Sequence, residues 1–471
     1  MTTARRGAAT TDTGLWSNAR YVLWLISDTS KGLATTLAGF AVPLIALIVT
    51  DDPAQAGVIG GVGMAVRVVT TLYGGVLADR HGRIALMLTG AGIATILAAG
   101  FTVLSLTDAL TFTTILVVEV LLMVRAGLFE PASESALKEI VPDESMGRAQ
   151  AANQGRDAAL QLAGSPLGGA LLGVGAWLVG AVMALCYALA GATALALRRA
   201  ARRAGIADRA ADAAARRVAW GDPDESGVSP RGAGRHADAG ADGPGSPAGP
   251  AAGPSAGPNA IAEIREGFGW LFSRPDLRGV LLITTIVNLG FNAATTTVVY
   301  ALQQSGYSEL AIGWMSSGVG VVMLAGAVVA PLLVPRIGAG TLTIVGLCAA
   351  TAGAIIVSMV ETPWAIAAVL GASVFLLPAL NAAMMGYFMV ATPTELLGRA
   401  NSAVGVLAMG AMPLAPLIAG FGLALAGRQW TILFSAALCA IAAVLAVTNR
   451  ALRALPAEAG WAAHAGRFDL R

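Results

Sequence analysis

Eight charged residues interrupt apolar stretches in the first half of the chain, where each must be paired or put to use. Charged side chains inside a bilayer are costly, and they commonly serve transport, proton transfer or ligand binding. A carboxylate beside a cation in a desolvated site can take up and release a proton near neutral pH, so the acids are candidates for proton coupling. The eight residues are Asp28, Lys31, Arg67, Glu119, Arg125, Glu130, Arg156 and Asp157.

Asp28 and Glu119 are the two candidate proton carriers, with Lys31, Arg67 and Arg125 as the cations beside them. Asp28 and Lys31 are three residues apart and can pair on one helix face. Arg125 has no acid three or four residues away, so its partner is expected on another helix, at Asp28 or Glu119. The alternative interpretation is a static cluster of salt bridges that only orients the helices.

Three of the eight residues have a simpler explanation. Glu130, Arg156 and Asp157 lie near the predicted ends of their spans. A side chain in that position can extend its charge to the membrane surface, so this explanation is as good as a role in transport.

The second half of the chain carries no charge inside its apolar stretches away from their ends, so it is expected to contribute an uncharged part of a binding cavity. Asn288, Asn292 and Thr295 recur at helical spacing and form one polar face. Methionine and aromatic side chains suit apolar ligands of variable shape, although ordinary helix packing explains each residue alone equally well. The candidate cavity residues are Asn288, Phe291, Asn292, Asn381 and Met385.

The composition is that of a membrane protein. Of the 471 residues, 56% are hydrophobic and 12% are charged, whereas soluble proteins have about 25% charged residues. A net charge of +2 gives no reason to expect a nucleic-acid partner. The histidines fall in polar segments, the cysteines lie in separate apolar stretches, and no nucleophile–base motif or phosphate-binding glycine loop occurs. We therefore expect no metal, no cofactor and no enzymatic activity.

Twelve apolar stretches are long enough to cross a bilayer as helices, which takes about 20 residues each. Lys and Arg gather in the connections on one side of the membrane, and acids gather on the other. Because basic loops stay in the cytoplasm, both termini are predicted to be cytoplasmic. The predicted spans are 21–49, 55–78, 84–106, 110–137, 148–173, 175–197, 278–303, 310–334, 340–360, 363–390, 400–426 and 429–449.

A Gly-, Pro- and Ala-rich segment at 198–260 divides the first six spans from the last six. Its composition cannot bury enough apolar surface to fold, so a disordered linker is predicted. A repeat indicates two related halves, because Pro, Glu, Gly, Arg and Ala coincide in 142–150 and 393–401. The predicted organisation is a cytoplasmic tail at 1–20, a six-helix bundle at 21–197, a cytoplasmic linker at 198–276 that is largely disordered to 260, a second six-helix bundle at 277–450 and a cytoplasmic tail at 451–471.

The loop between the second and third spans carries a motif. Residues 74–83 read Gly-Gly-Val-Leu-Ala-Asp-Arg-His-Gly-Arg, which resembles the loop signature of the major facilitator superfamily, G-x-L-a-D-r-x-G-r. The resemblance implies the fold of that superfamily, an all-α polytopic membrane protein with 12 transmembrane helices in two pseudo-repeated six-helix bundles. Gly75 is expected to allow close helix approach and Gly82 a tight turn. The motif residues that would serve gating are Gly75, Asp79, Arg80, Gly82 and Arg83.

Asp79 follows the second span, where its charge opposes the dipole of its own helix. It is therefore expected to face the N-terminus of another helix, near Arg399, and to hold the cytoplasmic side closed. Arg80 and Arg83 are expected to pair with acids such as Glu139 or to contact phosphates. The alternative is that the two arginines only direct the topology.

Two further stretches resemble a drug- and siderophore-exporting branch of this superfamily, the enterobactin-exporter and macrolide-efflux type. One extends from 129–132 through 141–142 to 148–153, and the other is Gly-Ser-Pro-Leu-Gly-Gly at 164–169. The second is a loose version of an antiporter motif, in which Ser165 stands where Gly is usual. Its candidate residues are Gly164, Pro166 and Gly169.

The resemblance implies a proton-coupled exporter of small amphipathic compounds, such as a drug, an antibiotic or a siderophore, that works by alternating access. The predicted protein is a monomer in the cell membrane, and its partners are a small-molecule substrate, protons and the lipid bilayer. The alternatives are a facilitator or importer of a small metabolite on the same fold, and a pore. Paired halves and broken helices fit alternating access better than a pore.

Overall fold

The computed structural model describes residues 15–220 and 268–469, apart from 394, 395, 397–399, 401–403, 406 and 408. Within these residues the chain is helical, and no strand occurs. In the first half the helices are α1 (Ala19–Thr50), α2 (Pro53–Arg80), α3 (Arg83–Leu106), α4 (Phe112–Ile140), α5 (Asp143–Val174) and α6 (Ala176–Trp220). In the second half they are α8 (Pro275–Gln304), α9 (Glu309–Leu333), α10 (Ala339–Val357), α11 (Pro363–Val374), α12 (Leu377–Ala391), α14 (Leu414–Thr448), α15 (Arg450–Arg453) and α16 (Trp461–Asp469).

Capping side chains determine where several helices begin. Asn18 accepts hydrogen bonds from two backbone N–H groups at the start of α1, and Asp52 accepts one at the start of α2. Pro53 occupies the first position of α2, where a missing N–H leaves no helical hydrogen bond unmade. Thr111 and Thr114 form a reciprocal capping box at the start of α4. Because these signals are local, the helix starts fall close to the predicted ones.

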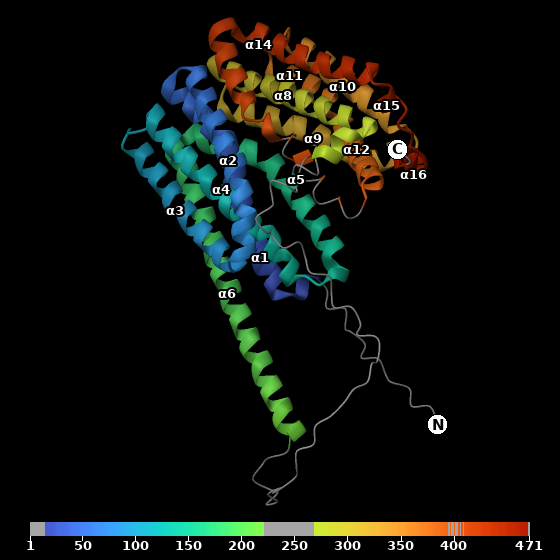
Figure 1. The fold of residues 1–471 in the computed structure, drawn as a ribbon. Coiled ribbons are helices and arrows are strands. Elements are labelled where there is room, and N and C mark those ends of the chain that lie inside the picture. The colour runs from blue at the N-terminus through green and yellow to red at the C-terminus, as the bar shows by residue number, and fades with distance from the viewer. Residues whose placement is uncertain are drawn as a thin grey trace, which may run out of the picture.

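Among the described residues, ten helical segments are long and apolar enough to cross a membrane. One of them, α14, contains Gly427 at φ 75°, so it comprises two helices joined by a bend, and the first of these is the end of the predicted span 400–426. α5 is 32 residues long but is more polar than the ten. Counting α14 as two spans and including α5 confirms the prediction of an all-α membrane protein with twelve spans in two six-helix bundles (Figure 1).

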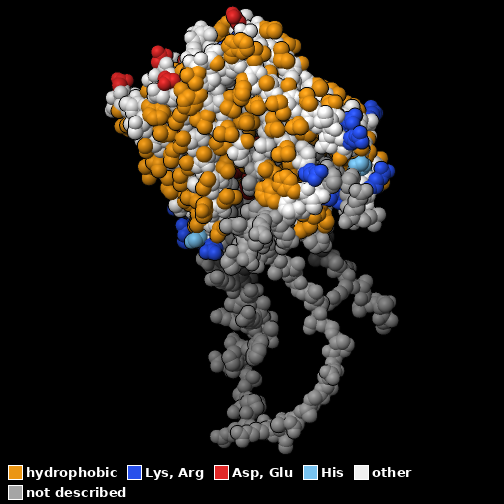
Figure 2. All heavy atoms as spheres, turned by 45° about the horizontal axis from the view of Figure 1, so that its top comes forward, with side chains coloured by type: hydrophobic (Ala, Val, Ile, Leu, Met, Phe, Trp, Pro, Cys, Tyr) orange, Lys and Arg blue, Asp and Glu red, His pale blue; other side chains and the backbone are white. Residues whose placement is uncertain are grey.

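Charged side chains mark the two ends of the helices, and hydrophobic side chains cover the surface between them (Figure 2). A bilayer requires such an apolar belt. We call one end the acidic end, because its connections carry Asp51, Asp52, Asp108, Glu309 and Glu361. We call the other the basic end, because its connections carry Arg80, Arg83, Lys138, Arg336 and Arg453.

The sixth span continues beyond its predicted end at residue 197. α6 is 45 residues long and projects from the basic end (Figure 1). Alanine and arginine are strong helix formers, and they dominate 198–217. This part of the predicted linker is therefore helical, and the prediction of disorder is wrong there. The remainder of the predicted disordered segment lies outside the described residues.

The predicted C-terminal tail is folded against the second half. Trp461 is 6% exposed, packs against Gly386 of α12 and donates its indole N–H to the carbonyl oxygen of Pro456. The same carbonyl oxygen accepts a hydrogen bond from the backbone N–H of Ala339, the first residue of α10. The C-terminal segment thus joins α10 to α12 at the basic end.

The two halves pack closely at the acidic end. A Cβ atom added at Gly57 of α2 would lie 2.5 Å from the carbonyl oxygen of Pro416 in α14, and one added at Gly420 would meet the backbone of Gly57. On α5, a Cβ atom added at Gly169 would meet the carbonyl oxygen of Glu309 in α9. Small residues that let backbones approach are typical of helix contacts in membranes.

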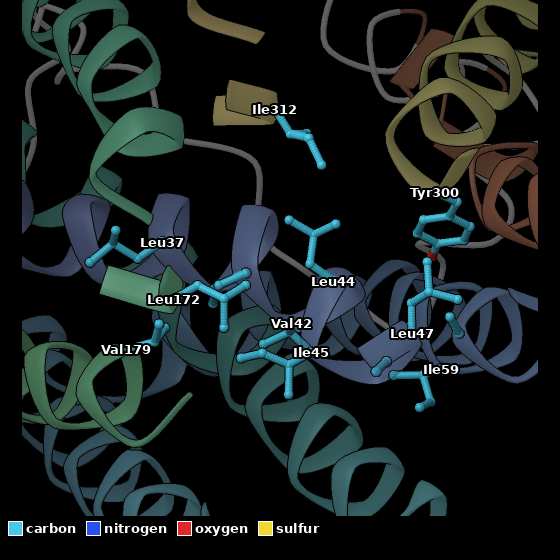
Figure 3. Packing of buried hydrophobic residues seen from close by; sticks show 14 of the residues in the cluster. Leu37, Val42, Leu44, Ile45, Leu47, Ile59, Leu172, Val179, Tyr300 and Ile312 are labelled. Carbon is cyan, nitrogen blue, oxygen red and sulfur yellow. The ribbon is translucent and has the colours of Figure 1, made fainter. Parts of the chain in front are cut away.

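A buried apolar core crosses from one half to the other in the same region (Figure 3). Leu44 and Ile45 of α1 belong to one cluster with Tyr300 of α8 and Ile312 of α9, and all four are at most 1% exposed. The acidic end is therefore closed by contacts between the halves.

Candidate functional site

Asp28 of α1 is the centre of a first ion-pair group. Its Oδ1 accepts a hydrogen bond from Ser133 of α4 at 2.6 Å and lies 2.6 Å from Nζ of Lys31. Its Oδ2 lies 2.8 Å from Nη2 of Arg156 on α5. The same guanidinium contacts Asp157 at 2.7 Å. The group links three helices, and the predicted pairing of Asp28 with Lys31 is confirmed.

Glu130 of α4 is the centre of a second ion-pair group. Its Oε2 accepts from Nη2 of Arg67 on α2 at 2.9 Å, and its Oε1 lies 3.9 Å from Nη1 of Arg125. Arg125 is 4% exposed, donates through Nε to the carbonyl oxygen of Gly90 at 3.2 Å and lies over the ring of Tyr187 at 4.7 Å. These contacts stabilise a guanidinium with almost no access to solvent.

The expected partner of Arg125 is wrong. The acid beside Arg125 is Glu130 on its own helix, five residues away, and neither Asp28 of α1 nor Glu119, which also lies on α4. For Arg156 and Glu130, where two explanations were open, the structure shows ion pairs within the bundle, whereas the side chain of Asp157 is 55% exposed. The predicted fifth span begins at 148, but α5 begins at Asp143. Arg156 therefore lies nearly four helical turns from the start of α5.

Glu119 belongs to neither group. It lies eleven residues before Glu130 on α4, which is about 16 Å along the helix. Its side chain packs against Gly63 of α2, where an added Cβ atom would lie 3.0 Å from its Cγ and Oε1. Among the described residues its buried Oε2 has no hydrogen-bond partner. Asp28 and Glu119, the two predicted proton carriers, thus have very different surroundings.

Two cavities of similar size adjoin each other within the molecule. The first, about 710 Å³, is lined only by the first half, including Asp28, Lys31, Arg67 and Arg156. The second, about 750 Å³, lies between the halves and is mostly apolar, with Phe40, Leu162, Phe291, Met323 and Leu324 in its wall. Thr36 and Gln161 line both cavities, so the two cavities adjoin each other at these side chains.

Four of the five predicted cavity residues line cavities in the second half. Phe291 and Asn381 line the second cavity, and Asn288 lines a small adjoining one of about 80 Å³. Met385 lines a cavity of about 280 Å³ between α8 and α12. Asn292 differs, because its amide donates to the backbone carbonyl of Asn288 at 2.8 Å and it lines none of the cavities described above.

The loop motif is held mainly by Arg83, which lies 2.9 Å from Glu139 and donates to the carbonyl oxygen of Ser135 at 2.9 Å. The expected pairing of Arg83 with Glu139 is thereby confirmed, and Arg80 is exposed. The expected contact of Asp79 with the region of Arg399 involves side chains outside those that the structure describes.

The glycines of the loop motif do not serve as expected. Close helix approach occurs at Gly74, where an added Cβ atom would meet the backbone of Gly127 in α4. A Cβ atom added at Gly75 would have no neighbouring atom within 4 Å. Gly82 has φ −59°, which any residue adopts, so its place before α3 does not require glycine.

The antiporter-like motif lies where α5 meets other helices. Gly164 lies against Thr36 of α1. Gly169 lies against the backbone of α9, and a Cβ atom added at Gly313 of α9 would lie 2.9 Å from Cα of Pro166. The motif therefore supports the contact between halves at the acidic end.

Sequence reasoning missed Ser133, Thr36 and Gln161. Ser133 is three residues after Glu130, and this helical spacing predicts that both side chains lie on the same face of α4. Thr36 and Gln161 carried no such signal, because isolated polar residues in a span most often serve helix packing. Within the described residues no group of three or more His, Cys, Asp or Glu is placed to hold a metal ion.

The family model described as Major Facilitator Superfamily matches residues 29–403 and 280–466. No curated protein sequence matches the chain significantly.

Several solved transporters have a similar fold. A bacterial homologue of the human lysosomal transporter Spinster, in an inward-facing and unoccupied conformation, has 15% identity and a TM-score of 0.62, with 94% of this chain and 98% of that chain covered. A bacterial homologue of the iron transporter ferroportin in an inward-facing state has 14% identity and a TM-score of 0.62, with coverages of 90% and 97%. The nucleoside transporter NupG has 10% identity and a TM-score of 0.62, with coverages of 91% and 100%. At these identities the likeness concerns the fold alone.

Proposed function

The chain belongs to the major facilitator superfamily, and on this premise we propose that it is a proton-coupled exporter of small amphipathic compounds, such as a drug, an antibiotic or a siderophore. The observation that carries the proposal is the pair of adjoining cavities. One cavity has a charged wall and the other a largely apolar wall, and Thr36 and Gln161 lie at their boundary. A solute with a polar group and an apolar body fits such a space better than a sugar or an ion does.

The distribution of charge supports an orientation in the membrane. Basic connections remain in the cytoplasm, so we assign the basic end to the cytoplasmic side of the cell membrane. The contacts between halves close the acidic end, and the first cavity lies toward the basic end beside Glu134 and Lys138. The conformation is then one in which the cavity receives a solute from the cytoplasm, with the monomer as the transporting unit.

We assign proton coupling to Glu119 in preference to Asp28. Both oxygens of Asp28 have donors, two of which are cations. The buried Oε2 of Glu119 has no donor among the described residues. A buried carboxylate oxygen without a donor is costly to keep charged. That property suits a group that binds a proton in one conformation and releases it in another.

Everted membrane vesicles test the proposal. Their interior is acidified, an interior pH dye is included, and a panel of lipophilic antibiotics and siderophores is added. We expect substrate-dependent alkalinisation of the interior that is lost in Glu119→Gln. The matched control is Glu139→Gln on the same helix, whose side chain is 56% exposed and pairs with Arg83.

Uptake of a compound without proton movement contradicts the antiport mechanism and indicates a facilitator. Unchanged alkalinisation in Glu119→Gln contradicts the assignment of the proton carrier and leaves the exporter intact.

A further inference from the structure

We infer that the two adjoining cavities together bind an amphipathic anion, with its negative group at Lys31 and Arg67 and its apolar body between the two halves. The inference rests on the proposed transport function and specifies the class of substrate. Carboxylates, sulfonates and phosphate esters with an aromatic or aliphatic body share this chemistry.

The first argument is the balance of donors and acceptors in the wall of the first cavity. Asp28 has a cation at hydrogen-bond distance from each carboxylate oxygen, and Glu130 has Arg67 at 2.9 Å on Oε2 and Arg125 at 3.9 Å from Oε1. An ammonium group has three N–H donors and a guanidinium has five. Among the described residues, Lys31 uses a donor only toward Asp28, and Arg67 pairs only with Glu130. Lys31 and Arg67 thus keep N–H donors without a partner beside the cavity, so the complementary ligand at these two cations is an acceptor.

The second argument is the balance of charge. The two ion-pair groups contain four cations and three acids, which leaves one positive charge in excess while Glu119, the assigned proton carrier, holds its proton. The cations are Lys31, Arg67, Arg125 and Arg156, and the acids are Asp28, Glu130 and Asp157. At the cavity rim, Glu134 and Lys138 balance each other. One anionic group on the ligand would neutralise the excess, and a cationic ligand would increase it.

The third argument is access. The side chains of Lys31 and Arg67 are 22% and 39% exposed, respectively, and both line the first cavity. Thr36, which lines both cavities, is five residues beyond Lys31, or about 7.5 Å along α1. A molecule that occupies both cavities past Thr36 would place its anionic group at Lys31 and its body beside Phe291.

Isothermal titration calorimetry on the purified full chain in detergent tests the inference with three probes of one shape. Naphthoate is anionic, its methyl ester is neutral and naphthylmethylamine is cationic. We expect naphthoate to bind at least about tenfold more tightly than the ester, the ratio for one charge-assisted hydrogen bond. Lys31→Gln should abolish this preference and leave binding of the ester unchanged. The matched control Lys138→Gln removes the other lysine lining this cavity and should keep the preference.

Ester or amine binding as tight as that of naphthoate overturns the inference, as does the absence of naphthoate binding to the unmodified chain. If Lys31→Gln also loses binding of the ester, the fold of that variant is damaged. Arg67→Gln then replaces it, and it should likewise lose the preference for naphthoate and keep binding of the ester. Calorimetry needs no proton gradient. Naphthoate selectivity without proton movement in vesicles therefore supports the anion site and contradicts the proton coupling. Proton movement in vesicles without naphthoate selectivity supports the proton coupling and contradicts the anion site.

Discussion

Asp28 stabilises two cations at once and is itself stabilised by both. Its side chain is 13% exposed, so its contacts operate in a medium of low polarity, where a charge left without a partner is expensive. Ser133 adds a neutral donor from α4. The three donors come from three helices, which makes this carboxylate a structural link between α1, α4 and α5.

We predict that Asp28→Asn lowers the free energy of unfolding by about 3 kcal/mol, because it leaves Lys31 without its acidic partner. The loss of Asp28 destabilises Arg156 less, because Arg156 keeps its ion pair with Asp157. The double variant Asp28→Asn/Lys31→Gln should recover most of the loss, because it removes the unpaired ammonium. Thermal unfolding of the detergent-solubilised variants measures both effects. A single variant as stable as the unmodified chain would show that the ion pair contributes nothing.

The sequence predicts those parts of the site that depend on one helix. Asp28 and Lys31 pair as expected because three residues separate them on α1. The contacts of Asp28 with Arg156 and of Glu130 with Arg67 join different helices. They depend on the rotation and height of each helix relative to its neighbour, and no local spacing contains that information.

At the scale of the helices, hydropathy alone locates most of the fold. A span must be about 20 apolar residues long whatever packs around it, and α1 to α4 accordingly begin and end close to the predicted positions. Hydropathy fails where a helix leaves the membrane. It ends the sixth span at residue 197, although α6 continues as a helix to Trp220, and it cannot show that the C-terminal segment folds back onto α10 and α12.

We predict that Trp461→Ala detaches the C-terminal segment from the basic end. The indole is 6% exposed and fills the space above Gly386, so its removal should cost about 3 kcal/mol. Hydrogen exchange in α16 should accelerate, while exchange in α1 stays the same. Trp430→Ala is the matched control, because Trp430 is 67% exposed. Equal exchange in α16 of both variants would contradict the described packing.

At the scale of the whole molecule, the two halves touch through backbones at one end and enclose cavities toward the other. Gly57 and Gly420 allow this contact because neither has a side chain to separate the helices. Such an interface can open as a unit when the halves rock against each other. The two ends should therefore be accessible in turn and never together.

Cysteine labelling with a membrane-impermeant maleimide tests this claim most directly, in a chain without its three native cysteines. Gln161→Cys reports on the cavities, and Leu417→Cys reports on the closed end, where Leu417 packs against Gly61. Gly57→Ala, which places a Cβ atom 2.5 Å from a carbonyl oxygen, should open the acidic end. Gly92→Ala is the control, because an added Cβ atom there has no neighbour within 4 Å.

Alternating access predicts that Gly57→Ala increases labelling of Leu417→Cys from the acidic side and decreases labelling of Gln161→Cys from the basic side, with Gly92→Ala changing neither. Increased labelling at both positions together would indicate a continuous pore and would contradict the account.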